Sequence, residues 1–245
     1  MSLMLGAFEL SAPFAKGGMG EIWRGRHGTT GTPVAVKVLT ADGLKEDRLV
    51  SAIHSEIRAA AALAHPNIVW LYDAGTADDA IEADSAGQIK AGCPWFAMEM
   101  ATGSTLRERA FGLNWIATRR VLLDLLEALA HAHARGVIHR DLKPSNVLFM
   151  NQGTRIKLTD FGMVYAIESP DIPLSGGTPS YMAPEQFEGD GRIQGPWTDL
   201  YSLGCMAWAL VSGHRPFHAN GGASALYRMH AVKPVPPLKP RFPVP

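Results

Sequence analysis

The chain has 245 residues, and its 23 Lys and Arg residues are equal in number to its 23 Asp and Glu residues. Proteins that bind nucleic acid by neutralising phosphates usually carry a basic excess, so this balance argues against a nucleic-acid partner. The longest apolar run, 203–211, is far shorter than the roughly 20 residues that cross a bilayer, and the first residues lack a signal-peptide pattern. The two cysteines have no metal-binding spacing. We therefore expect a cytoplasmic globular protein with no membrane segment.

The first third of the chain is predicted to be a meander of antiparallel strands with one helix. Short runs of apolar and β-branched residues between glycine-rich turns predict strands at 8–14, 21–26, 33–39, 68–73 and 95–100. Helical spacing of apolar residues predicts a helix over 47–64, which ends at His65-Pro66-Asn67. The acidic, glycine-containing stretch 77–92 is expected to be a solvated loop.

The second half of the chain has a helical pattern. Helices are predicted over 115–135 and 198–211, and the second is apolar nearly all round, so we expect it to be buried on every side. Strands followed by helices predict an α+β chain with two lobes, which we place at 1–100 and 101–232. The tail 233–245 holds six prolines and is expected to be extended, so the sequence is expected to stop before its fold does.

The first candidate for chemistry is the glycine-rich turn at 15–20, Ala-Lys-Gly-Gly-Met-Gly, between two predicted strands. Glycines let a backbone approach a polyphosphate and direct its N–H groups at the oxygens. A plain hairpin turn explains the same residues equally well. The turn joins two strands and lacks a GK[ST] ending, so it is neither a P-loop nor a dinucleotide fingerprint.

The second candidate is Lys37, which lies in the predicted strand 33–39 on the same face as Ala35. A charge in this position needs an anionic partner, and Glu56 on the following helix is a suitable counter-ion that would hold the ammonium group for phosphate oxygens. Taken alone, Lys37 is equally well a solvent-facing strand residue, and Glu56 an exposed helix charge. The pair gains weight only together with other motifs.

The strongest signal is the segment 139–146, His-Arg-Asp-Leu-Lys-Pro-Ser-Asn. A chance match to its five specified positions has a probability on the order of 10⁻⁶ to 10⁻⁷ per starting point. Asp160-Phe161-Gly162 begins nineteen residues after Asp141, and Ala183-Pro184-Glu185 follows. Their order and spacing resemble the eukaryotic-type (Hanks-type) protein kinases, and the glycine-rich turn is most similar to the bacterial Ser/Thr branch. The resemblance covers about residues 8–217.

The resemblance implies a bilobal protein-kinase-like fold and an ATP-dependent serine/threonine kinase that uses Mg²⁺ or Mn²⁺. The partners would be ATP, a protein substrate and the chain itself through autophosphorylation. Lys143 and the segment 177–181, Gly-Thr-Pro-Ser-Tyr, are typical of kinases with Ser/Thr acceptors. Arg140 beside the catalytic base implies a switch by phosphorylation, with Ser169 and Ser175 as candidate sites and Ser175 preferred.

The resemblance also assigns catalytic and metal-binding roles. Asp141 would orient the substrate hydroxyl and accept its proton, and Lys143 would neutralise the moving phosphoryl group. Lys37, braced by Glu56, would hold the α and β phosphates. Hard cations prefer oxygen ligands, and the two residues assigned to the metal are Asn146 and Asp160.

The nucleotide would be held by the glycine-rich turn and by an apolar adenine pocket. Ile22 and Ala35 would form the roof of this pocket, Leu148 its floor, Met98 the gatekeeper, and the backbone of Glu99 and Met100 the hinge; core packing explains these residues equally well. With Lys37, the full nucleotide-binding set is Ala15, Lys16, Gly17, Gly18, Gly20, Ile22, Ala35, Met98, Glu99, Met100 and Leu148.

Two departures from the family and two alternatives remain. Ala15 replaces the first glycine of the turn, which we expect to weaken nucleotide binding at most. The usual arginine partner of Glu185 would lie in a helical region beyond Phe217, before which the chain ends, so Glu185 is expected to lack it. A pseudokinase or scaffold would have lost the lysine, the base or the metal aspartate, and none is lost. A small-molecule kinase of the aminoglycoside or choline type shares the Asp and Asn spacing but lacks the Ala-Pro-Glu segment.

Overall fold

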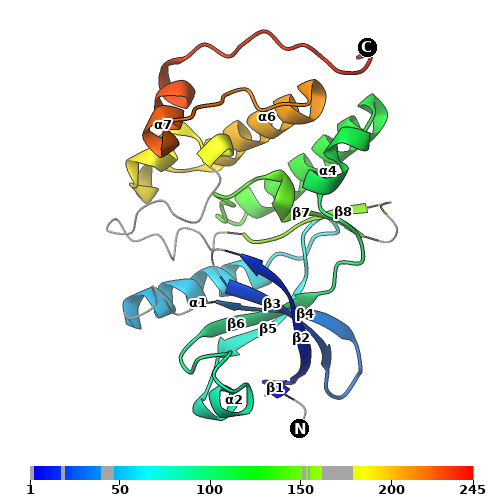
Figure 1. Ribbon diagram of the computed structural model, residues 1–245, viewed down its shortest axis with the longest axis vertical. Coiled ribbons are helices and arrows are strands. Elements are labelled where there is room, and N and C mark those ends of the chain that lie inside the picture. The colour runs from blue at the N-terminus through cyan, green and yellow to red at the C-terminus, as the bar shows by residue number, and fades with distance from the viewer. Residues whose placement is uncertain are drawn as a thin grey trace. The chain divides into compact units, whose positions relative to one another are not determined.

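The computed structural model describes residues 3–17, 20–39, 47–150, 153, 155–161 and 179–244. The chain divides into two compact units, each shown as part of the ribbon in Figure 1. The first unit comprises Met1–Ala64 and Val69–Ala101, and the second comprises His65–Ile68 and Thr102–Pro245. Gly18, Gly162, Ser169 and Ser175 lie outside the described residues.

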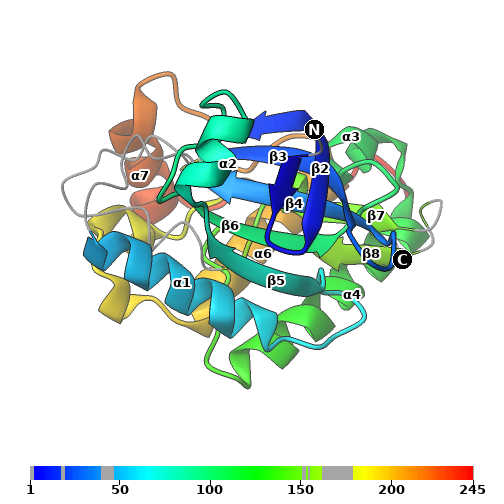
Figure 2. The same cartoon turned by 90° about the horizontal axis from the view of Figure 1, so that it is seen from below.

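Within the described residues, the first unit is built on a six-stranded sheet in the order β1-β2-β3-β4-β6-β5. Its strands, all paired in antiparallel fashion, are β1 (Leu3–Leu5), β2 (Phe8–Gly17), β3 (Gly20–His27), β4 (Pro33–Leu39), β5 (Leu71–Thr76) and β6 (Pro94–Glu99). Helix α1 (Asp47–Ala61) packs against β5 and β6 (Figure 2). The predicted strand 68–73 is displaced toward higher residue numbers, because Ile68 instead forms a parallel bridge with Leu158 in the second unit.

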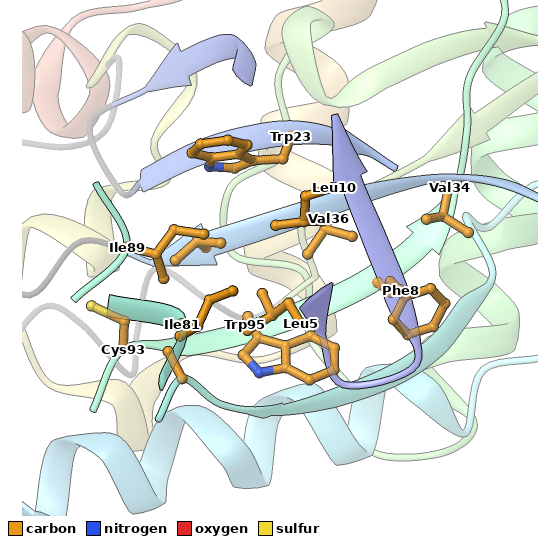
Figure 3. Close-up of a cluster of buried hydrophobic side chains, with 13 residues drawn as sticks. Leu5, Phe8, Leu10, Trp23, Val34, Val36, Ile81, Ile89, Cys93 and Trp95 are labelled. Atoms are coloured by element: carbon orange, nitrogen blue, oxygen red, sulfur yellow. The ribbon is translucent and has the colours of Figure 1, made fainter. Parts of the chain in front are cut away.

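Alternation along β4 gives the sheet two chemically different faces. Val34, Val36 and Val38 lie in a buried cluster together with Trp23 and Trp95 (Figure 3). Successive side chains of a strand point to opposite faces, so the residues between these valines belong to the other face. The hydrophobic cluster therefore occupies one face of the sheet and leaves the other for the polar chemistry described below.

The prediction of a solvated loop over 77–92 is wrong. This segment forms the short helix α2 (Asp79–Asp84), whose N-cap Asp78 accepts a hydrogen bond from the N–H group of Ile81 at 2.9 Å. Ile81 and Ile89 are 2% and 1% exposed and belong to the buried cluster (Figure 3). The few apolar residues of this segment are surrounded by polar ones in the sequence, which is the pattern of a solvated loop. Their burial depends on a sheet formed by distant residues.

Replacing Ile89 with alanine is expected to lower the free energy of unfolding by about 2–4 kcal/mol, because it removes buried methyl groups and leaves a cavity against the sheet. Urea unfolding followed by tryptophan fluorescence measures the change. The matched control is Ile116→Ala, at a side chain that is 77% exposed. If the two variants lose the same stability, residues 77–92 do not cover the sheet.

The second unit is mainly helical. Its α-helices are α3 (Leu106–Arg109), α4 (Trp115–His133), α6 (Pro196–Ser212) and α7 (Gly222–Val232), with the hairpin β7 (Val147–Met150) and β8 (Arg155–Leu158). Short 3₁₀ helices connect them: η2 (Ala110–Gly112), η3 (Pro144–Asn146), η5 (Pro179–Tyr181), η6 (Pro184–Glu188) and η7 (Gly191–Ile193). The first unit is an antiparallel sheet with a helix, and the second unit is mainly helical. This arrangement confirms the predicted α+β fold class. Within the described part of the chain, no helix is both long and apolar enough for a membrane span.

The expectation that the helix at 198–211 is buried on every side is wrong for one face. Trp197 and Leu200 of α6 are 59% and 50% exposed, and Gly204, one turn further, is also exposed. The helix packs against α4 and η5 through its other faces. An apolar sequence favours burial, but it does not show how many faces the neighbouring elements cover.

The proline-rich tail has no regular secondary structure, yet Arg241 attaches it to the rest of the second unit. Its guanidinium group donates hydrogen bonds to the carbonyl oxygens of Ala110, Phe111, Leu113 and Leu210. Its backbone N–H group donates to the carbonyl of Val211 at 2.9 Å. Leu210 and Val211 lie in the last turn of α6, where carbonyls have no partner within the helix. The other three carbonyls lie in η2 or directly after it.

Candidate active site

A buried carboxylate holds the segment that carries the kinase-like motif. Asp199 of α6 is fully buried, and its Oδ2 atom lies 2.7 Å from Nε2 of His133. The same oxygen accepts the backbone N–H of His139 at 2.8 Å, and Oδ1 accepts that of Arg140 at 2.8 Å. Several donors are needed to stabilise a charge without water. Asp199 therefore fixes the path of the chain just before Asp141.

His139 links this segment to the strand that precedes Asp160. Its Nδ1 atom accepts the backbone N–H of Asp141 at 3.2 Å, so in the neutral ring the proton is on Nε2. Nε2 then donates to the carbonyl oxygen of Thr159 at 2.9 Å. The buried imidazole ring also packs against Phe161, with the ring centroids 4.7 Å apart. His139 thus connects Asp141 to the residues on either side of Asp160.

Asp141, Lys143 and Asn146 meet in a compact polar cluster. Nζ of Lys143 lies 2.6 Å from Oδ2 of Asp141. Nδ2 of Asn146 donates to the same oxygen at 3.0 Å and to the backbone carbonyl of Asp141 at 2.9 Å. Because both side-chain donors share Oδ2, Oδ1 is the oxygen that could receive a proton from a hydroxyl group. The sequence-predicted catalytic residues of this segment are therefore brought together.

Two residues of the site have strained backbone. Arg140 and Asp160 both have φ of 63°, in the left-handed region that favours glycine. Such a conformation costs on the order of 1–3 kcal/mol for other residues and is concentrated at functional sites. Hydrogen bonds hold Arg140 in place, because its N–H group binds Asp199 and its carbonyl accepts from Nε2 of Gln186 at 2.6 Å.

Asn146 and Asp160 provide a suitable ligand set for a magnesium ion. The backbone N–H of Thr159 donates to the carbonyl of Asn146 at 3.0 Å, which brings the residue before Asp160 beside Asn146. Nδ2 of Asn146 is already a donor, so its Oδ1 is the atom that could bind a cation. Mg²⁺ is typically bound by one or two carboxylates together with substrate phosphates. Among the described residues, no group of three or more His, Cys, Asp or Glu could hold a metal alone.

In the first unit, the glycine-rich turn is the end of the β2–β3 hairpin. Three cross-strand pairs lead toward the turn: Ala15 with Ile22, Lys16 with Glu21, and Gly17 with Gly20. Nζ of Lys16 lies 2.8 Å from Oε1 of Glu21. Gly20 has φ of 152°, and a β-carbon there would lie 2.1 Å from the carbonyl oxygen of Val38. Gly20 is therefore required for the close approach of β3 and β4, whereas a β-carbon at Gly17 would meet no atom within 4 Å.

The face of the sheet opposite the hydrophobic cluster carries Lys37 and most of the predicted adenine-pocket residues. Directly opposite residues of antiparallel strands share a face. Lys37 lies opposite Ile22 on one side and Phe96 on the other, and Ala35 lies opposite Met98. Lys37 is only 6% exposed, and its Nζ lies 6.0 Å from the centroid of the Phe96 ring. The sheet therefore directs a buried lysine onto the same face as three predicted roof and gatekeeper residues.

The remaining predicted residues have different environments. Oε1 of Glu99 accepts the backbone N–H of Trp70 at 2.7 Å, and Met100 follows β6 as a half-buried residue. Glu56 lies on the half-buried side of α1, next to the fully packed Ile57. The pairing of Lys37 with Glu56 stays a prediction. Leu148 is half-buried on β7 of the second unit, opposite Lys157, and its role as the floor of the adenine pocket also stays a prediction.

Sequence reasoning missed the partners of two acidic residues. Asp199 stands inside an otherwise apolar helix, and a buried carboxylate must find donors, so its position was a signal that could have been used. Glu185 was expected to lack its usual arginine partner. In the structure its Oε1 accepts a hydrogen bond from the hydroxyl group of Thr198 at 2.7 Å.

The chain belongs to the protein kinase domain family, whose model matches residues 8–237. It is 35% identical over 97% of its length to the serine/threonine-protein kinase PknA of Mycobacterium tuberculosis (strain ATCC 25618 / H37Rv) and 34% identical over 97% to the serine/threonine-protein kinase Pkn1 of Myxococcus xanthus. The chain spans 54% and 33% of these relatives. A crystal structure of the Mycobacterium tuberculosis PknI kinase domain, solved as a point mutant, matches with a TM-score of 0.69 and 27% identity, covering 89% of this chain and 79% of that chain. The predicted family is therefore confirmed, with bacterial kinases among the relatives.

Proposed function

We propose that the chain is an ATP-dependent protein kinase that transfers the γ-phosphoryl group to serine or threonine hydroxyls of proteins. The observation that carries this proposal is the cluster of Asp141, Lys143 and Asn146, held in place by the buried carboxylate of Asp199. Relatives named as serine/threonine-protein kinases support the acceptor class.

The chemistry follows from the donors and acceptors of the cluster. Oδ1 of Asp141 would orient the acceptor hydroxyl and take its proton, which is worth about 10²- to 10⁴-fold in rate. Lys143 would direct its remaining N–H donors at the moving phosphoryl oxygens. Asp160 and Oδ1 of Asn146 would hold Mg²⁺ or Mn²⁺. The metal, when bound, supplies positive charge at the terminal phosphates.

The first unit would hold the rest of the nucleotide. Lys37, braced by Glu56, would bind the α and β phosphates, and the backbone of the turn at 15–20 would cover them, including Gly18. The adenine ring would pack against Ile22, Ala35 and Met98. The backbone at 99–100 would provide hydrogen bonds to the ring.

A radiolabelled phosphate assay tests the proposal. The wild-type chain, incubated with γ-labelled ATP and Mg²⁺, is expected to label itself or a general protein substrate on serine or threonine, and chelation of the metal should stop the labelling. A pseudokinase would bind the nucleotide without transferring phosphate. Folded protein that binds Mg-ATP but labels neither itself nor a substrate would overturn the proposal in favour of that alternative.

Replacing Lys37 with methionine is expected to weaken binding of Mg-ATP by about 10- to 100-fold, because hydrogen bonds to charged groups are each worth about 1.5–3 kcal/mol. Methionine is of similar length and should keep the apolar contacts of the lysine stem. Isothermal titration calorimetry measures the change. Lys90→Met, at an exposed lysine paired with Glu82, is the matched control. Equal affinity in both variants would exclude Lys37 from nucleotide binding.

Phosphorylation at Ser169 or Ser175 is a further part of the proposal, and both residues lie outside the described part of the chain. The support is Arg140, a cation next to the proposed catalytic base. Hydrogen bonds to its backbone N–H and carbonyl groups hold Arg140 in place. A phosphate could pair with its guanidinium group and order the neighbouring segment. Mass spectrometry after incubation with Mg-ATP should find the modification, preferentially at Ser175. An unmodified segment in a fully active enzyme would contradict it.

A further inference from the structure

The second unit contains a pocket beside residues 139–146, which we call the catalytic loop. The pocket has a volume of about 320 Å³. Its walls come from α3 and η2, from the end of α6 and the residues after it, and from the tail. Its apolar lining includes Phe111, Ala209 and Leu210. The proposed phosphoryl transfer gives this pocket no role.

Basic side chains line this pocket. Arg107, His214, Arg215, His218 and Arg241 line it, and none of the described lining residues is Asp or Glu. The guanidinium of Arg241 is occupied by backbone carbonyls, so it stabilises the wall. Arg107 is exposed at the rim and Arg215 is half-buried. These two arginines are therefore the charged donors that a ligand could reach.

Arg107 and Arg215 line the same pocket, and Arg215 is held in place by a neighbouring side chain. Nη1 of Arg215 donates to the hydroxyl group of Ser180, which orients the guanidinium group. Burial raises the pKa of the neighbouring Tyr181, and the charges of Arg215 and Arg107 both act in the opposite direction. Arg107, Arg215 and Tyr181 all line the same pocket. Planar guanidinium groups are suited to carboxylate and phosphate groups, which they bind in bidentate geometry.

The pocket is close to the proposed catalytic base. Pro144 lines it and starts η3, three residues after Asp141. Consecutive Cα atoms are about 3.8 Å apart, so the Cα atoms of Asp141 and Pro144 are separated by at most about 11 Å. An extended peptide covers that distance in about three or four residues at roughly 3.3 Å each. A peptide with its hydroxyl at Asp141 could therefore place a nearby side chain in the pocket.

We propose that this pocket binds an anionic side chain of the protein substrate, within about four residues of the phosphorylated serine or threonine. The anionic group is a carboxylate or a phosphate, with Arg107 and Arg215 as the specificity-determining residues. This inference rests on the proposed function. It adds a substrate class, namely acidic or previously phosphorylated segments.

The test uses a set of peptides with one serine acceptor in an otherwise neutral sequence. Aspartate, phosphoserine or asparagine is placed in turn at each of the four positions on either side of the acceptor. Aspartate or phosphoserine at one or more positions is expected to raise kcat/KM by about tenfold over asparagine, as for a partly exposed charged hydrogen bond. The difference between aspartate and phosphoserine shows which anion the pocket prefers.

Charge reversal shows whether the arginines cause the preference. Arg107→Glu is expected to abolish the preference for aspartate and to favour lysine at the same peptide position. Because Arg107 is exposed, this variant should keep its fold, which urea unfolding checks. Arg119→Glu, at an exposed arginine of α4 outside the pocket lining, is the matched control and should keep the preference. Arg215→Gln is a second variant that should weaken it.

Two results would overturn the inference: equal kcat/KM for all three residues at every position, or a preference that Arg107→Glu leaves unchanged. Fluorescence anisotropy of the same peptides without ATP separates this inference from the proposed function. If no phosphate is transferred but acidic peptides still bind more tightly, and lose this advantage in Arg107→Glu, the pocket stands and the proposed function fails. Equal binding of all peptides would remove the pocket as a docking site.

Discussion

Replacing Asp141 with asparagine is expected to slow phosphoryl transfer by about 10²- to 10⁴-fold while the protein remains folded. An asparagine oxygen can still accept the hydrogen bonds from Lys143 and Asn146, which now converge on Oδ2. The amide cannot take a proton from the acceptor hydroxyl, so the loss should fall on the chemical step. Single-turnover kinetics with radiolabelled ATP measures that step, and calorimetry should show that Mg-ATP still binds.

The matched control is Asp84→Asn, at an exposed aspartate that ends α2 in the first unit. It removes the same charge from the chain without touching the catalytic loop, and its transfer rate should equal that of the wild type. A transfer rate for Asp141→Asn within a factor of two or three of the control would mean that another group accepts the proton.

Replacing Asp199 with asparagine is expected to lower the free energy of unfolding by about 1–3 kcal/mol, because a buried N–H donor loses its acceptor. Two backbone N–H groups and His133 approach the two carboxylate oxygens. An amide offers only one acceptor oxygen, so its NH₂ group must face one of these donors in a dry environment. Urea unfolding measures the loss, and the transfer rate should fall as well because Asp141 is no longer positioned.

Glu127→Gln is the control for this second variant, because Glu127 is an exposed acid on α4, the helix that packs against α6. Its stability should change by less than about 0.5 kcal/mol. If Asp199→Asn is as stable as the control, water or another side chain must accept the hydrogen bonds from the backbone N–H groups of His139 and Arg140. Asp199 would then not position the catalytic segment.

The sequence predicts those parts of the site whose geometry is local. Asp141, Lys143 and Asn146 lie within six consecutive residues, so their spacing alone indicates that their side chains can meet. The face of Lys37 is predicted for the same reason, because alternation along one strand decides it. In each case the conformation of a short stretch of backbone decides where the side chains point, so their spacing in the sequence is enough to predict it.

Features that depend on distant segments could not be predicted in this way. Burial of Ile81 and Ile89 requires a sheet assembled from strands on both sides of them in the sequence. Asp199 and His139 meet although they are sixty positions apart in the sequence. The exposed face of Trp197 and Leu200 likewise depends on which elements pack against α6. Propensity and periodicity depend only on neighbouring residues in the sequence, whereas the burial and contacts of these side chains are decided by tertiary packing.

The attachment of the tail by Arg241 has a consequence for biosynthesis. Its guanidinium group binds carbonyl oxygens that precede it by 128 to 131 residues. On a translating ribosome, η2 is therefore made long before the side chain that caps it, and contacts of such wide separation form late in folding. The nascent polypeptide could order its catalytic loop while the docking pocket is still open on the side of the tail.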